Sequence, residues 1–161
     1  MHYQQEERFR YHILAMQRAG NRELTVQLKE LDLTPSQAEV LTVLNERSML
    51  TLKEIGHHLI CETGSPSRLV NTLVKNGLVE GKTDEQDQRA RRYRLSNQGK
   101  QKCTAVKQIE DRLYNHIQSI YTEEELNILN QLFTKYIEQT DFHSVFKKRS
   151  LYEGEPNSGE L

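Results

Sequence analysis

Apolar residues recur three and four positions apart along most of the chain, a spacing that places them on one face of an α-helix. The longest stretches of this kind cover residues 4–30 and 96–121. Several predicted helices begin with a Thr that is followed three residues later by Glu or Gln, the pattern of a capping box. These pairs are Thr34 with Gln37, Thr51 with Glu54, and Thr122 with Glu125. The pattern predicts a mainly helical protein whose helix starts are defined locally.

Residues 51–95 depart from the long helices and predict two short helices followed by a hairpin. Ser65 and Pro66 stand in the usual order of an N-cap and a first-turn proline, and they open the second short helix. Two short strands at residues 78–83 and 90–95 then flank a polar turn. A helix pair followed by a hairpin is a winged helix-turn-helix. The predicted fold class is therefore mainly α with a small β-hairpin wing (α+β), extended by long terminal helices.

The polar side of the second short helix carries groups that suit DNA reading. A guanidinium and an amide can each make two hydrogen bonds to a base edge in the major groove. Hydroxyls at the exposed first turn suit phosphate, because the amides of a helix N-terminus attract anions. The predicted DNA-contacting residues of this helix are Ser65, Ser67, Arg68, Asn71, Thr72 and Lys75. A solvated helix face would have similar composition, so the interpretation depends on the hairpin that follows.

The hairpin is basic, and its predicted DNA-contacting residues are Asp87, Arg89, Arg91 and Arg92. Arg89 is expected at the wing tip in the minor groove, with Asp87 holding its guanidinium by a charge-assisted bond. An ordinary surface ion pair is the alternative for these two residues. Because side chains alternate along a strand, Arg91, Arg92 and Arg94 cannot all face DNA. Those that do are expected to bind phosphates.

The charge distribution changes the meaning of the overall balance. The 161-residue chain has a formal net charge of -1, yet residues 63–102 hold nine basic residues against four acidic ones. Such segregation indicates a polyanion-binding part attached to an acidic remainder. Hydrophobic content of 35% is low for a self-sufficient globule, which favours a core completed by a second copy.

The motifs of this region resemble those of the MarR/SlyA family of bacterial transcription regulators. Residues 87–99 are similar to the family's D-x-R-x-x-R wing and the Leu-Ser/Thr-x-x-Gly helix start behind it. Residues 68–79 resemble the family's recognition helix running into its first wing strand. The resemblance extends from the N-terminal helix to about residue 140.

The resemblance implies a homodimer joined through its terminal helices. The apolar stripes of those helices independently call for a partner, which two-fold symmetry provides. We therefore expect residues 1–33 and 97–152 to form the dimerisation region, residues 34–96 the DNA-binding domain and residues 153–161 a disordered tail. Two recognition helices one turn of B-DNA apart predict a pseudo-palindromic operator. The predicted protein is a repressor that a small molecule releases from double-stranded DNA.

The resemblance also implies an inducer of small aromatic or phenolic character, bound between the dimer helices and the winged domain. Tyr11, His12, Met16 and Arg18 on the first helix are candidates to line that site, or equally ordinary packing and surface residues.

Other signals leave alternatives open. Cys61 precedes the predicted recognition helix and would be the thiol of an oxidation sensor if its pKa were lowered. The adjacent His57, His58 and Cys61, with Glu62 behind them, suggest a metal sensor, although a full ligand set is not evident. Cys103 is expected to pack as a small apolar residue. A winged domain used only for protein contact is a further alternative, because this fold does not dictate function.

Nothing in the sequence indicates catalysis. Neither a nucleophile-base pair, nor a phosphate-binding glycine loop, nor paired catalytic carboxylates stand out, so we expect no enzyme, cofactor or bound metal. No apolar run approaches the length of a membrane span, and the first residues lack a secretory pattern. A cytoplasmic protein without membrane contact is expected.

Overall fold

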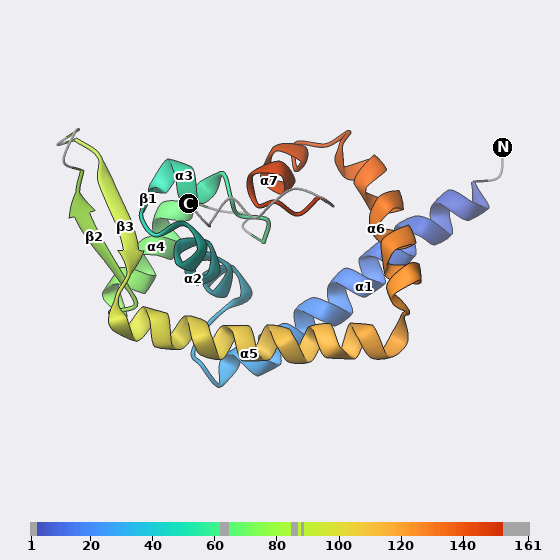
Figure 1. Ribbon diagram of the computed structural model, residues 1–161, viewed down its shortest axis with the longest axis horizontal. Helices are drawn as coiled ribbons and strands as arrows, with labels where there is room; N and C mark the ends of the chain where they lie inside the picture. The colour runs from blue at the N-terminus through green and yellow to red at the C-terminus, as the bar shows by residue number, and fades with distance from the viewer. Residues whose placement is uncertain (1–2, 62–64, 85–86, 88, 153–161) are drawn as a thin grey trace.

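The computed structural model describes residues 3–61, 65–84, 87 and 89–152. Helices dominate, and a small antiparallel sheet protrudes at one end of the long helix α5 (Figure 1). This confirms the predicted fold class of a mainly helical protein with a wing. The elements in order are α1 (Gln4–Lys29), α2 (Pro35–Arg47), β1 (Leu50–Thr51), α3 (Leu52–Gly56), α4 (Pro66–Lys75), β2 (Val79–Thr83), β3 (Arg91–Leu95), α5 (Asn97–Ile120), α6 (Glu123–Ile137) and α7 (His143–Lys148).

The three expected capping boxes all form, so the sequence sets these helix starts as predicted. Thr34, Thr51 and Thr122 each accept a hydrogen bond from the backbone three residues on, and the Gln or Glu there accepts one in return from the backbone of the Thr. A side-chain cap of this kind satisfies donors that the first turn of a helix leaves unpaired. At α5 the hydroxyl of Ser96 accepts from the Gly99 N–H.

The sheet has the strand order β1-β3-β2, and both pairs are antiparallel. The β2–β3 pair is the predicted wing hairpin. Strand β1 was not predicted, because two residues are too few to show an alternating pattern. Leu50 pairs with Tyr93 and Thr51 pairs with Arg92, so β1 joins the wing directly to the start of α3.

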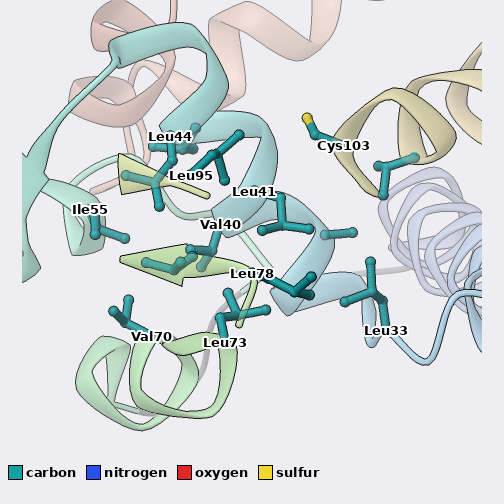
Figure 2. Close-up of a cluster of buried hydrophobic side chains, with 14 of the residues drawn as sticks. Leu33, Val40, Leu41, Leu44, Ile55, Val70, Leu73, Leu78, Leu95 and Cys103 are labelled. Atoms are coloured by element: carbon teal, nitrogen blue, oxygen red, sulfur yellow. The ribbon is translucent and has the colours of Figure 1, made fainter. Parts of the chain in front are cut away.

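The core surrounds α2 and lies between α4, α5 and β3 (Figure 2). Its fully buried side chains include Val40, Leu41 and Leu73. Cys103 is also buried and packs as predicted. A close approach closes this core: a Cβ at Gly99 would collide with the Leu78 carbonyl oxygen, to which Ser96 N–H also donates. Glycine is therefore required where the wing passes into α5.

The apolar faces of α1 and α6 remain uncovered in the single chain. The apolar stripe of α6 is uncovered in the single chain, where no residue of the helix is buried. Leu132 on α6 is 54% exposed, and Met16 on α1 is equally exposed. A groove of about 830 Å³ runs between α1 and α6–α7, lined mainly by apolar side chains such as Phe9 and Phe133. These faces lack the covering that a core helix requires.

The last described residues fold back toward α2. Val145 of α7 is buried and anchors this helix on the rest of the chain. Phe142 and Leu151 nearby stay largely exposed. Residues 153–161, predicted to be a disordered tail, lie outside the described residues. Of the helices described, none is both long and apolar enough to cross a bilayer.

Candidate nucleic-acid interface

Helix α4 buries one face and exposes the other as predicted. Val70 and Leu73 are buried in the core, whereas Arg68, Asn71 and Lys75 are exposed. The hydroxyls of the remaining candidates are engaged locally. Ser65 Oγ and Ser67 Oγ lie 2.6 Å apart, and the Thr72 hydroxyl donates to the Arg68 carbonyl oxygen at 3.0 Å. Ser65 occupies the N-cap position without a side-chain cap bond. The guanidinium, the amide and the ammonium group are thus the solvent-facing groups of this helix.

The wing turn is built by two aspartates. Asp84 Oδ1 accepts from the Asp87 N–H at 3.0 Å, and Asp87 Oδ1 accepts from the Arg89 N–H at 2.9 Å. The expected bond from Asp87 to the Arg89 guanidinium is therefore replaced by one to the Arg89 backbone. Aspartate side chains often stabilise turns by bonding the backbone two residues on. Asp87 consequently shapes the turn that presents Arg89.

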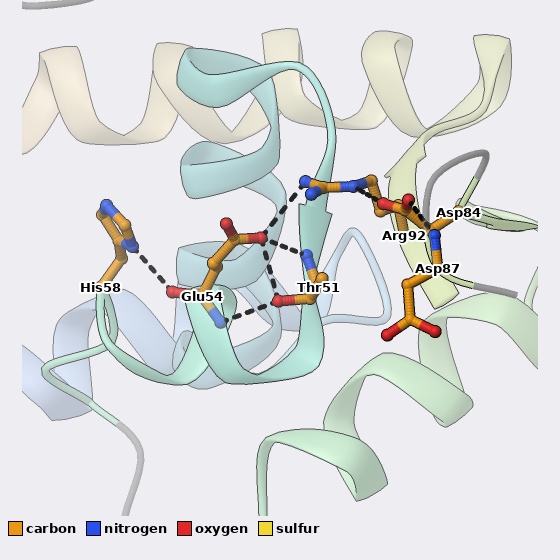
Figure 3. A network of polar contacts seen from close by, with 6 residues as sticks. All are labelled: Thr51, Glu54, His58, Asp84, Asp87 and Arg92. Carbon is orange, nitrogen blue, oxygen red and sulfur yellow. Dashed lines mark hydrogen bonds and ion pairs between the residues drawn. The ribbon is translucent and has the colours of Figure 1, made fainter. Parts of the chain in front are cut away.

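Arg92 connects the wing to the helix-turn-helix (Figure 3). Its guanidinium donates to the Asp84 carboxylate through Nε and to Glu54 Oε2 at 3.4 Å through Nη1. Glu54 is also the capping residue of α3, where it accepts from the Thr51 N–H at 2.8 Å. That backbone bond chiefly lowers the pKa of Glu54, with a smaller contribution from Arg92. The Asp84 bond raises the pKa of Arg92. Its guanidinium therefore makes ion pairs within the protein while the side chain stays 37% exposed, and its predicted DNA contact stays a prediction.

The other wing arginines are more exposed. Arg94 binds Glu80 at 3.1 Å across the hairpin, and Arg91 donates to the Gly81 carbonyl oxygen at 3.2 Å. Within the described residues, the side chains of Arg89, Arg68 and Lys75 have no acidic partner. These three exposed cations come from α4 and the wing, which lie at the same end of the molecule (Figure 1).

The turn before α4 is fixed by a buried carboxylate on α2. Glu39 Oε1 accepts from the Ile60 N–H and Oε2 from the Cys61 N–H, both at 2.8 Å. Ser36 Oγ adds a bond to the Cys61 carbonyl oxygen at 3.1 Å. Sequence reasoning missed Glu39, because nothing local shows that a carboxylate on one helix will bond a turn 21 residues away.

The sensor alternatives gain little from this geometry. Cys61 lies at the surface, yet desolvation of its thiol, together with the neighbouring Glu39 carboxylate, raises its pKa to about 11. A sensing thiol requires the opposite shift. His58 Nδ1 lies 2.7 Å from the Glu54 carbonyl oxygen, Glu62 lies outside the described residues, and the described part of the chain holds no His/Cys/Asp/Glu group suited to a metal.

The four residues predicted to line an inducer site are all exposed on α1. Met16 lines the groove between α1 and α6, whereas Arg18 lines a separate hollow along α1. Neither hollow contains Tyr11 or His12, so the structure does not gather the four around one cavity.

Comparison with known proteins agrees with this geometry. Residues 33–99 match the family model of a winged helix DNA-binding domain. The HTH-type transcriptional repressor IacR of Pseudomonas putida is 26% identical over 105 residues, which are 65% of this chain and 63% of IacR, less than two thirds of its length.

Solved structures share the fold. A MarR variant from E. coli complexed with operator DNA superimposes with a TM-score of 0.74 at 24% identity, covering 84% of this chain and 97% of that one. The organohalide-sensing regulator RdhR-CbdbA1625, bound to 2,4-dichlorophenol, gives a TM-score of 0.75 at 24% identity over 84% of this chain and 80% of its own. These comparisons confirm the expected resemblance to MarR-type regulators.

The raised pKa of Cys61 predicts an unreactive thiol at neutral pH. With a pKa of about 11, roughly one thiol in a thousand is ionised at pH 8. In a Cys103→Ser variant, alkylation of Cys61 by iodoacetamide should be slow at pH 8 and accelerate about tenfold per pH unit up to pH 10. A rate that levels off between pH 8 and 9 would show an ordinary or activated thiol and restore the oxidation-sensor alternative.

Proposed function

We propose that the chain is a transcriptional regulator of the MarR type, which acts through its winged helix domain as a homodimeric repressor on a pseudo-palindromic operator. The observation that carries this proposal is the exposed cations of α4 and the wing at one end of the molecule. Protein groups of this kind neutralise phosphates and release condensed counterions. Cytoplasmic action on double-stranded DNA, without membrane contact, belongs to the same proposal.

Each element has a distinct role in this proposal. Helix α4 enters the major groove, where Arg68 and Asn71 read base edges and Lys75 contacts phosphate. The wing follows the backbone, and Arg89 reaches the adjacent minor groove, whose potential is most negative where it is narrow. Arg91 contributes a phosphate contact from the strand. Ser65, Ser67 and Thr72 complete the contact surface at the start and side of α4.

A second copy of the chain is the proposed occupant of the uncovered helical faces. Helices α1 and α6 carry exposed apolar residues that would be stabilised by burial. A two-fold axis can bury such a patch against the same patch of a second copy. Large exposed apolar patches commonly mark protein–protein interfaces. The resulting dimer would carry two heads separated by one turn of B-DNA, which accounts for a pseudo-palindromic operator.

A small aromatic inducer is part of the proposal. RdhR-CbdbA1625, a neighbour in fold, has been solved in a 2,4-dichlorophenol-bound form, and IacR is named a repressor. An inducer could bind more tightly to dimers in which the two winged domains are not one turn of B-DNA apart. It would then shift the population toward dimers that fit the operator poorly. A winged domain used only for protein contact is the rival that the DNA experiments below exclude or support.

The proposed function predicts how the protein binds duplex DNA. Affinity for random duplex should fall steeply with salt, and a protein-contact module should show no such slope. On a selected operator, Arg68→Ala should cost about 1–3 kcal/mol and relax base preference, because it removes a base contact. Arg89→Ala should weaken binding most where the flanks are rich in A·T pairs.

The matched control is Lys107→Ala, which removes an exposed cation of α5 outside the proposed interface. Fluorescence anisotropy at several salt concentrations measures all four proteins. If Arg68→Ala and Arg89→Ala bind the operator as the parent does, the site assignment is wrong. If the parent shows no salt-dependent binding, DNA reading itself is refuted.

The second prediction concerns the dimer. Leu132→Asp places a charge on the exposed apolar stripe of α6 and should shift the protein to a monomer, since burying an unpaired carboxylate is costly. Asn127→Asp makes a similar change on an exposed polar position of the same helix and should leave the dimer intact. Sedimentation velocity distinguishes the two. A parent that sediments as a monomer, or a dimeric Leu132→Asp protein, would contradict the proposed interface.

A further inference from the structure

The last described helix, α7, is followed by a residue that meets the helix-turn-helix through a buried ion pair. Arg149, which follows α7, places Nη1 2.9 Å from Glu39 Oε1 on α2. The side chains are only 14% and 8% exposed, in contrast to the exposed Arg94–Glu80 pair of the wing. The two residues lie 110 positions apart, so this contact joins the C-terminal part of the chain to α2 of the winged domain.

The carboxylate of Glu39 also binds backbone in the same place. Its two oxygens accept the N–H groups of Ile60 and Cys61, the last described residues before the segment that leads into α4. Three donors therefore converge on one buried carboxylate, namely two amides of the turn and one guanidinium of the C-terminal segment. The position of the cation and the path of the turn are linked through the same two oxygen atoms.

The energetic reason for this linkage is the cost of a buried charge. A buried carboxylate is stable only if a countercharge and hydrogen bonds replace its lost water. Removing one partner of such a pair leaves an uncompensated charge, which then seeks solvent or a new partner. Without Arg149 the Glu39 carboxylate would be more stable if it turned toward solvent. The Ile60 and Cys61 N–H groups would then lose their acceptor.

Other contacts hold α7 in place independently of Arg149. Val145 is buried, and the Arg47 guanidinium at the end of α2 donates to the Lys148 carbonyl oxygen. Replacing the Arg149 side chain should therefore leave α7 docked while removing the cation. This separates the effect of the ion pair from the effect of losing the helix.

We propose that Arg149 is a positioning residue for the recognition helix. Acting through Glu39 and the Ile60 and Cys61 amides, it holds the end of the turn from which the chain continues to α4. The proposal rests on the proposed function of α4 in reading DNA. It also ties the C-terminal segment to the helix-turn-helix through a charged contact.

The test compares Arg149→Gln and Arg149→Lys with Lys148→Gln in the full chain. Lys148→Gln removes the same charge from the neighbouring exposed position and keeps the carbonyl that Arg47 uses. Two quantities are measured: amide hydrogen exchange at Ile60 and Cys61, and affinity for a selected operator against random duplex. Thermal unfolding confirms that each variant is folded.

Arg149→Gln should speed exchange of both amides and lower operator affinity about tenfold, the size expected of a hydrogen bond to a charged group. Affinity for random duplex should fall less, because the phosphate contacts of the wing do not depend on the position of α4. Arg149→Lys should restore part of the loss, and Lys148→Gln should match the parent in exchange.

Unchanged exchange in Arg149→Gln would overturn the coupling whatever the DNA result. Faster exchange with unchanged operator affinity would overturn the positioning role. Equal losses on operator and random duplex, shared by Lys148→Gln, would reduce the effect to simple charge. A parent without preference for any duplex sequence would instead refute the proposed function, and the exchange data would still report whether the ion pair holds the turn.

Discussion

Besides the pairing of β1 with β3, the guanidinium of Arg92 ties the wing to the helix-turn-helix. This group lies between Asp84 of the wing and Glu54 of α3. Each carboxylate also bonds backbone, because Asp84 orders the wing turn and Glu54 caps a helix. An isolated surface ion pair contributes little to stability. Here a shared cation fixes the relative direction of two elements, and the Asp84 side chain is only 10% exposed. The presentation of Arg89 relative to α4 follows from that constraint.

The same architecture separates a self-sufficient part from a dependent one. The core gathers around α2 and takes in α4, the sheet and the first half of α5, where Cys103, Val106 and Ile109 are buried. Further along, α5 and α6 bury progressively less, and the apolar side chains of α1 and α6 face outward. The chain's hydrophobic content is 35%, and within one chain the apolar side chains of α1 and α6 find too few apolar neighbours to be buried. A second copy supplies the missing surface in the proposed dimer.

What the sequence predicted well is local. The capping boxes, the wing hairpin and the polar face of α4 follow from spacings within a few residues. Arg92 lies 38 positions from its partner Glu54, and Arg149 lies 110 positions from Glu39, and no periodicity reveals such pairs. For this reason the sequence predicts a DNA contact for Arg92 but does not predict its ion pairs within the protein. The capping box did mark Glu54, but only as a cap.

The central claim is that Arg92 positions the wing and that Arg89 makes the contact. A double-mutant cycle on operator affinity, with Arg89→Ala, Arg92→Gln and the combined variant, tests it most directly. If Arg92 acts through the wing tip, the combined variant should bind about as weakly as Arg92→Gln alone, because a misplaced Arg89 no longer contributes. Fully additive losses would show that Arg92 holds DNA on its own and would contradict the account.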